Sequence, residues 1–324
     1  MYYNQRIAIV ILSLAGSSAG SSIIRLYHCT DGDRNFNVFC APIVAGSESS
    51  VSGLSESFAM VPVDTQSDGT IIKVDKMNST IAVPDVFVLL QPEEGSESED
   101  LVTLRTSLRV SSLSKPAPAL GLGYMSPLVV GETSVLSNFA ITKTNLVLNS
   151  QNQARNFCQD GGDSIKLVPV HPPNTLVWSV RVGANVFKID SASDLDVVPR
   201  PYYDRIVEYI NNTPNVTVIG ESNPYGGQRA LITNCEDHMH LFPNIRYPIK
   251  DDTDQIVATI NLHPQDYLNV VKTKYSTPGQ PKACKLQIAP TTNIRAYTLG
   301  VNIFKKMTVY FERSSNQIGF CESR

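Results

Sequence analysis

Short apolar runs and turn-forming residues alternate along the whole chain, most clearly near its C-terminus. Leu299-Gly300 joins an apolar residue to a glycine, as in a strand that another backbone approaches closely. Val301 to Phe304 can start a short amphipathic turn, whereas Met307 to Phe311 alternates and is rich in aromatic and branched residues, which predicts a strand. Ser314-Ser315-Asn316 predicts a turn, and Ile318 to Phe320 predicts the returning strand.

The same patterning predicts elements earlier in the chain. Phe58 to Val63 and Thr70 to Val74 predict a hairpin that turns at Asp68-Gly69. Ile81 to Leu90 is almost continuously apolar and predicts a strand. Further strands are expected at Asn145 to Leu148 and Val186 to Ile189, and helices at Val135 to Ile141 and at Pro201 to Ile210, the latter with Tyr202, Ile206, Tyr209 and Ile210 on one side.

Composition supports a mostly β protein. Charged residues make up only 18% of the chain, glycine and proline number 19 and 20, and long helical patterns are scarce. A length of 324 residues allows a large core and two lobes. The net charge of −3 and the lack of a basic stripe give no reason to expect nucleic acid.

Several features favour the secretory pathway. Six cysteines are an even count, and Cys29 and Cys40 bracket a polar loop, so a local disulfide between them is expected. Asn78 and Asn215 begin glycosylation sequons, and Asn211 begins a poorer one because Pro214 follows it.

The N-terminus allows two interpretations. Arg6, the apolar run from Ile7 to Leu14 and the small residues that follow are typical of a signal peptide spanning residues 1–20. The same run could instead form a buried strand that leads into a Gly/Ser turn. It is too short to span a membrane.

The C-terminal pattern resembles the signature of pepsin-like aspartic proteases: an apolar-Leu-Gly strand, a short helix, an aromatic-x-Val-Phe-Asp-Arg strand, a turn and Ile-Gly-Phe. Ala117 to Tyr124 resembles the strand that crosses behind the first catalytic turn of that family, with Gly121 in the crossing position. Leu167-Val168-Pro169-Val170, Trp178-Ser179-Val180 and Leu262 to Leu268 follow the order of its second-lobe motifs. The resemblance implies a mostly β, bilobal, pepsin-like acid protease fold with a cleft between two lobes.

The same resemblance implies two domains and two further disulfides. The N-terminal lobe would span residues 1–150 and the C-terminal lobe residues 151–324, dividing near residues 148–160. Cys235 and Cys284 resemble the second-lobe disulfide of the family, and Cys158 with Cys321 would join the start of that lobe to the C-terminus.

The chemistry of this family needs two carboxylates that share one proton about 3 Å apart, one acting as base on a water and the other as acid. Each aspartate normally lies in Asp-Thr-Gly or Asp-Ser-Gly. Asp190-Ser191-Ala192 matches the second of these turns, with Asp190 at the catalytic aspartate, Ser191 at the hydroxyl and Ala192 in place of glycine. An alanine there would be strained if its φ were positive.

The first-lobe partner is absent from the expected place. Two alignments of the Gly/Ser-rich segment put either Leu14 or Ser18 at the aspartate, and no acid occurs before Asp31. The hairpin expected over the cleft also lacks the tyrosine of the family. Its acids, Asp64 and Asp68, are expected to be solvated turn residues rather than substitutes.

Other chemistry is weakly supported. His238 and His240 form a His-x-His pair that could hold a metal with a third ligand, but a polar loop beside a disulfide is the preferred interpretation. We therefore expect no metal and no cofactor.

Three functions follow as hypotheses. The favoured one is a secreted, monomeric, catalytically inactive pepsin homologue that binds a peptide or protein ligand, without nucleic acid or a membrane span. One alternative is an active aspartic endopeptidase whose first Asp-Thr-Gly lies outside this sequence. Another is an inhibitor or decoy of a different secreted enzyme.

Overall fold

The structure is a computed structural model that describes residues 22–31, 34–46, 57–60, 70–73, 81–90, 102–111, 122–124, 129–130, 134–160, 165–173, 177–222, 228–270 and 282–324. Strands arranged in four sheets dominate this part of the chain, which confirms the predicted mostly β class. Helices are few and short. The longest of those described, α2, has 12 residues, and no described helix is long and apolar enough to cross a membrane.

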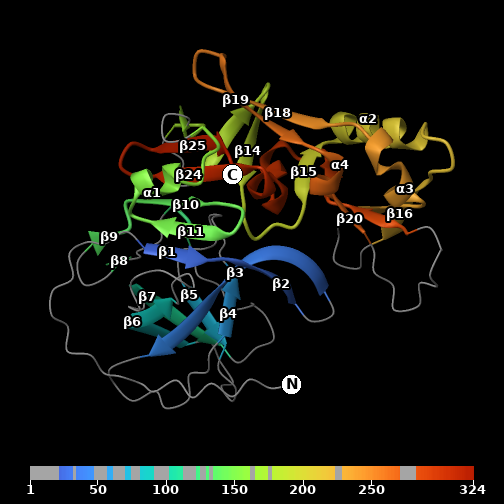
Figure 1. The fold of residues 1–324 in the computed structure, drawn as a ribbon. Helices are drawn as coiled ribbons and strands as arrows, with labels where there is room; N and C mark the ends of the chain where they lie inside the picture. The colour runs from blue at the N-terminus through green and yellow to red at the C-terminus, as the bar shows by residue number, and fades with distance from the viewer. Residues whose placement is uncertain are drawn as a thin grey trace.

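A six-stranded sheet joins segments from both ends of the chain. Its order is β1 (Ser22–Arg25), β11 (Asn145–Leu148), β10 (Asn138–Ile141), β24 (Met307–Glu312), β25 (Gln317–Glu322) and β12 (Lys166–Pro169). β2, β3, β4, β6 and β7 lie below β1 and β11 in Figure 1, whereas β18, β19 and α2 lie above them.

A seven-stranded sheet carries the candidate site. Its order is β19 (Ile256–Leu262), β18 (Ile245–Lys250), β13 (Ser179–Val182), β14 (Asn185–Ile189), β23 (Thr298–Leu299), β15 (Asp196–Pro199) and β22 (Ile288–Thr291). A four-stranded sheet is formed by strands that alternate along the chain with those of the seven-stranded sheet. Its order is β16 (Val218–Ser222), β17 (Gln228–Ile232), β21 (Cys284–Leu286) and β20 (Leu268–Val270).

The remaining strands form an eight-stranded sheet. The main path is β2 (Tyr27–Asp31), β3 (Arg34–Gly46), β6 (Ile81–Leu90), β7 (Val102–Ser111), β8 (Val129–Val130) and β9 (Ser134–Val135), with β4 (Ser57–Met60) on β3 and β5 (Thr70–Lys73) on β7. Of the hairpin predicted from Phe58 to Val74, the described strands β4 and β5 pair with β3 and β7, whereas its turn at Asp68-Gly69 and the residues beside that turn lie outside the described residues. Each strand finds its partner in another segment, a choice that the local pattern does not encode.

The helices are α1 (Gln151–Arg155), α2 (Arg200–Asn211), α3 (Cys235–His238) and α4 (Pro264–Tyr267), with 3₁₀ turns η2 (Met239–Leu241), η3 (Ile294–Ala296) and η4 (Val301–Lys305). α2 confirms the predicted helix, with Pro201 in its first turn. Ile206 and Ile210 are buried, but Tyr209 is 55% exposed and does not share their face.

The helix predicted at Val135 to Ile141 is wrong. Residues 138–141 form β10, which pairs with β11 on one side and β24 on the other. Phe139, Ala140 and Ile141 are consecutive and fully buried. A strand inside a sheet that is covered on both faces buries consecutive residues in this way, so the apolar run lacks the alternation that marks a half-buried strand.

One buried cluster runs through most of the described core. Trp178 is fully buried, and its ring centroid lies 5.1 Å from that of Phe311 and 4.9 Å from that of Tyr124. Its indole N–H donates to the carbonyl of Leu122 over 3.3 Å. The single tryptophan thus joins the predicted first-lobe segment around residues 122–124 to the C-terminal strands.

Candidate functional site

The Asp190 turn begins where β14 ends. The backbone N–H of Ala192 donates to Oδ1 of Asp190 over 2.9 Å, and the N–H of Ser193 donates to the Asp190 carbonyl over 3.2 Å. These two bonds close a tight turn around the carboxylate. Ser191 is fully buried, whereas the Asp190 side chain is partly exposed.

Alanine at position 192 fits this turn without backbone strain. The described residues with positive φ include five asparagines or aspartates and one glycine, but not Ala192. The strain that a positive φ would have imposed on alanine therefore does not arise.

The short strand β23 crosses directly behind the turn. β14 and β15 follow one another in the chain, yet β23 lies between them, parallel to β14 and antiparallel to β15. The N–H of Asp190 donates to the Leu299 carbonyl over 3.0 Å, and the N–H of Val301 donates to the Ser193 carbonyl over 2.8 Å. The crossing strand therefore bonds to both ends of the turn.

Gly300 makes this crossing sterically possible. A Cβ atom at this position would lie 2.5 Å from the Leu195 carbonyl oxygen and 2.7 Å from that of Ser193. Both atoms belong to the backbone and cannot rotate away. The close approach expected from Leu299-Gly300 is present, and only glycine satisfies it without moving the Asp190 turn.

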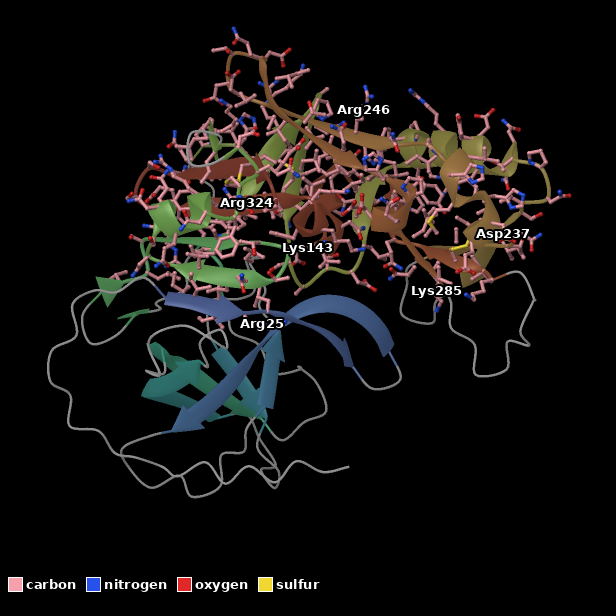
Figure 2. All side chains as sticks on the ribbon, in the orientation of Figure 1. Arg25, Lys143, Asp237, Arg246, Lys285 and Arg324 are labelled. Atoms are coloured by element: carbon pink, nitrogen blue, oxygen red, sulfur yellow. A yellow bond between two sulfur atoms is a disulfide. The ribbon has the colours of Figure 1, made fainter. Side chains whose placement is uncertain are left out.

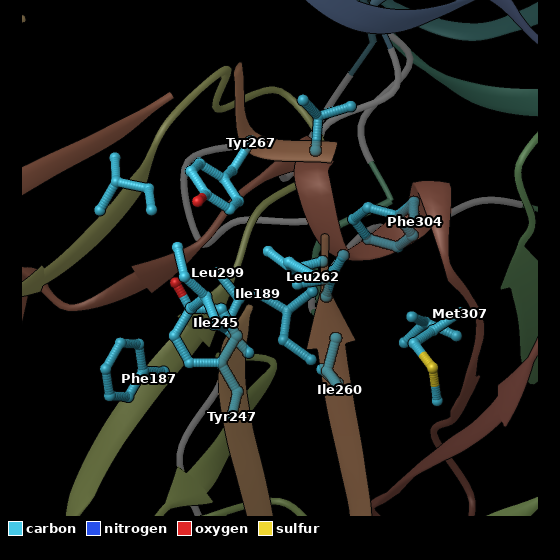
Figure 3. Close-up of a cluster of buried hydrophobic side chains, with 14 of the residues drawn as sticks. Phe187, Ile189, Ile245, Tyr247, Ile260, Leu262, Tyr267, Leu299, Phe304 and Met307 are labelled. Atoms are coloured by element: carbon cyan, nitrogen blue, oxygen red, sulfur yellow. The ribbon is translucent and has the colours of Figure 1, made fainter. Parts of the chain in front are cut away.

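The apolar side chain of the crossing strand β23 packs into the buried core. Leu299 lies among Ile189, Ile245 and Tyr247, all of them buried (Figure 3). Because Ile189 immediately precedes Asp190, the same core positions the strand and the turn.

Asp196 is a buried carboxylate that sequence reasoning missed. It is fully buried, and its Oδ1 accepts the N–H of Gly300 over 2.7 Å while its Oδ2 accepts the hydroxyl of Tyr247 over 3.2 Å. Burial raises its pKa from 3.8 to about 6, although these bonds, one from Asn302 and the charge of Lys305 act in the opposite direction. The only sequence signal was an acid at the start of the apolar strand Asp196–Pro199.

Lys305 extends this network away from the turn. Its Nζ donates to the Asp266 carbonyl over 2.6 Å and to Oδ1 of Asn302 over 3.2 Å. Asn302 in turn donates to the Gln287 carbonyl over 3.0 Å. Burial lowers the pKa of Lys305, partly offset by the charges of Asp196 and Asp266. The crossing strand and η4 are thus fixed by a connected set of buried polar groups.

Several other predicted site residues fall in parts of the chain that the structure does not describe. Leu14, Ser18, Asp64, Asp68 and Gly121 lie outside the described residues, as do Asn78 and the proposed signal peptide. Asn215 is described and exposed.

The structure contains two of the three expected disulfides. Cys158 bonds to Cys321 and Cys235 to Cys284, and both bonds are visible in Figure 2, near the labels Arg324 and Asp237 respectively. Cys29 and Cys40 lie on the paired strands β2 and β3, but their side chains fall outside the described part.

The two histidines of the His-x-His pair have different surroundings. Nδ1 of His238 lies 2.9 Å from the Asn234 carbonyl, whereas His240 lines an open hollow of about 480 Å³ with His263 and Glu236. No group of three or more metal-ligating side chains occurs within the described ranges. Glu236 is paired with Lys282 over 2.9 Å.

No protein-family model matches the sequence.

Proposed function

We propose that this chain is a secreted pseudoprotease with a bilobal, pepsin-like fold, which binds a peptide or protein in the cleft between its lobes. The observation that carries the proposal is the insertion of β23 between β14 and β15. It sets Gly300 behind the Asp190 turn, and the resemblance to pepsin-like proteases implies that an apolar-Gly strand crosses behind the acidic turn of each lobe. The two disulfides are compatible with a secreted or lumenal location.

The chemistry supports binding rather than hydrolysis. A single carboxylate lacks the coupled partner that lets one group act as base while the other acts as acid. This sequence offers Leu14 or Ser18 where the first aspartate is expected. Removing one member of such a unit abolishes most of the rate enhancement.

A rival function is supported by the integrity of the second turn. Asp190 keeps the hydrogen bond from the Ala192 amide, and its side chain is partly exposed. If a first Asp-Thr-Gly were supplied from outside this sequence, the chain would be an active aspartic endopeptidase.

Proteolysis assays distinguish the two. Protein expressed from the full-length transcript is incubated with a broad peptide library at acidic pH, with and without a pepstatin-type inhibitor, beside an Asp190→Asn variant. We expect no cleavage above background in either protein. Cleavage that the inhibitor blocks and that Asp190→Asn abolishes would establish the endopeptidase and reject the pseudoprotease.

Binding is measured on the same proteins. Immobilised wild type is expected to retain a subset of the uncut library. Asp190→Asn is expected to change that subset because the resemblance implies that this partly exposed carboxylate lines the proposed cleft. Asp204→Asn, a change at an exposed carboxylate of α2, is the matched control. A protein that retains no peptide but captures an enzyme from its native extracellular fluid would instead be an inhibitor or decoy.

A further inference from the structure

We propose that Asn215 carries an N-linked glycan and that this glycan covers the exposed edge formed by β16 and the end of α2. The proposal rests on passage through the secretory pathway and is independent of the ligand. It rests on the different exposure and hydrogen bonding of two neighbouring sequons, Asn211-Asn212-Thr213 and Asn215-Val216-Thr217.

The fold presents Asn215 to solvent on a fixed turn. The N–H of Val216 donates to the Thr213 carbonyl over 3.3 Å, so residues 213–216 form a turn with Pro214 second and Asn215 third. Asn215 has a φ of 61°, which the third position of a type II turn requires and asparagine tolerates. Asn215 and Thr217 are exposed, while Val216 between them is only 6% exposed and anchors the loop.

Neighbouring residues hold the backbone of this loop in place. Nδ2 of Asn234 donates to the Asn215 carbonyl over 2.7 Å, and the N–H of Thr233 donates to the Thr217 carbonyl over 3.0 Å. These anchors directly precede Cys235, which is bonded to Cys284. None of the described hydrogen bonds uses the Asn215 side-chain amide, so a sugar attached there displaces no described contact.

The fold uses Asn211 in the opposite way. Asn211 is the last residue of α2, and its Oδ1 accepts the N–H of Val218 over 2.9 Å. Its sequon threonine, Thr213, is only 8% exposed. This asparagine therefore connects α2 to β16, and we assign the glycan to Asn215 alone of the two.

The surface beside Asn215 contains exposed apolar side chains that a glycan would cover. β16 is the terminal strand of its sheet among the described strands, and Ile219 on it is 49% exposed. Tyr209 of α2 is 55% exposed, and β16, α3 and α2 lie together at one end of the molecule (Figure 1). An apolar edge strand is a template for pairing with another chain, and a glycan is bulky and solubilising.

The site is tested by expressing the full chain in a secretory eukaryotic host. Trypsin cleaves after Arg205 and after Arg229, so residues 206–229 form one tryptic peptide that contains both Asn211 and Asn215. Enzymatic removal of the glycan in heavy-oxygen water converts a glycosylated asparagine to a labelled aspartate. We expect the label at position 215 and an unmodified Asn211. An unlabelled position 215, or a label at 211 alone, would overturn the assignment without touching the proposed function.

The covering role is tested with matched variants. Thr217→Ala destroys the sequon and Thr217→Ser keeps it, so only the first should lose the glycan. We expect Thr217→Ala to shift from monomer to larger species in light scattering, and the added change Ile219→Lys to restore the monomer. A Thr217→Ala protein as monodisperse as Thr217→Ser would refute the covering role.

Discussion

Replacing Asp196 by asparagine should change how the stability of this protein depends on pH. The carboxylate is fully buried behind the Asp190 turn, and burial raises its pKa from 3.8 to about 6. Asparagine has nearly the same shape, and its Oδ1 can still accept the Gly300 amide proton. The variant therefore removes the titration while keeping the main contact.

The magnitude follows from the shift. Each pKa unit corresponds to about 1.4 kcal/mol of differential interaction, so moving from 3.8 to about 6 amounts to about 3 kcal/mol. Between these values the native protein binds more protons at Asp196 than the unfolded chain does. The Asp196 contribution to the free energy of unfolding must then fall as pH rises from about 4 to about 6, and stay low above that.

The assay is urea denaturation at a series of pH values with the disulfides intact. Trp178, the only tryptophan in the chain and fully buried, supplies the fluorescence signal. We compare the wild type with Asp196→Asn and follow the difference in unfolding free energy. It should grow in favour of the variant by about 3 kcal/mol between about pH 4 and pH 7.

The groups around Asp196 do not produce the same effect in this range. Tyr247 has a pKa raised well above its ordinary value by burial and by the nearby Asp196 charge, so it stays protonated. A difference that is constant across the pH series would refute the assignment of a buried, titrating carboxylate.

Asp254 provides a control of opposite sign. A hydrogen bond from Lys250, together with the charges of Lys250 and Arg181, lowers its pKa. Its contribution is present above the unfolded pKa and lost as pH falls through the folded one. Asp254→Asn should therefore lose stability relative to wild type at neutral pH, and this difference should shrink in acid.

Three further predictions use the same denaturation assay. Gly300→Ala places a methyl group 2.5 Å from the Leu195 carbonyl oxygen and should lower the free energy of unfolding by about 1–3 kcal/mol or more. Gly220→Ala, with nothing within 4 Å of the added methyl group, should leave the stability almost unchanged. Equal effects of the two substitutions would contradict the close crossing. Removing the Cys158–Cys321 disulfide, whose cysteines are 163 positions apart, should lower the free energy of unfolding by about 5 kcal/mol. Removing Cys235–Cys284, whose cysteines are 49 positions apart, should lower it by about 4 kcal/mol because the closed loop is shorter. The reverse order would contradict a loop-entropy origin. Tyr267→Phe removes the hydroxyl that donates to the Pro243 carbonyl over 2.7 Å and should cost about 1 kcal/mol, and an unchanged midpoint would show that this bond adds nothing.

Local patterning was enough to predict many strands. The alternation in Met307 to Phe311 and the run Ile318 to Phe320 correspond to β24 and β25, and Ile81 to Leu90 to β6. These segments hold branched and aromatic residues between turn signals, so the strand conformation is favoured wherever the segment packs. The turn between β24 and β25 likewise lies where Asn316 adopts a φ of 53°.

Pairing partners could not be predicted in this way. β10 is a strand because β24, far along the chain, lies beside it and both of its faces are buried. β4 pairs with β3 and β5 pairs with β7, partners that the local pattern of residues 58–74 does not indicate. Hydrogen bonds between distant strands depend on the whole chain, which no short window contains.

For the candidate site too, some features could be predicted from the sequence and others depend on contacts between distant segments. The sequence by itself determined that Asp190 starts a polar turn after a strand, and that Leu299-Gly300 suits a close backbone approach. Only the tertiary structure decided that these two segments meet, with Gly300 against the carbonyls of Ser193 and Leu195. It also decided the character of Asp196, an ordinary acid in sequence whose proton affinity rises because folding removes it from water beside the Gly300 amide. A residue type fixes which groups can bond or titrate, whereas solvent exclusion and the neighbours that set the outcome come from contacts between distant parts of the chain.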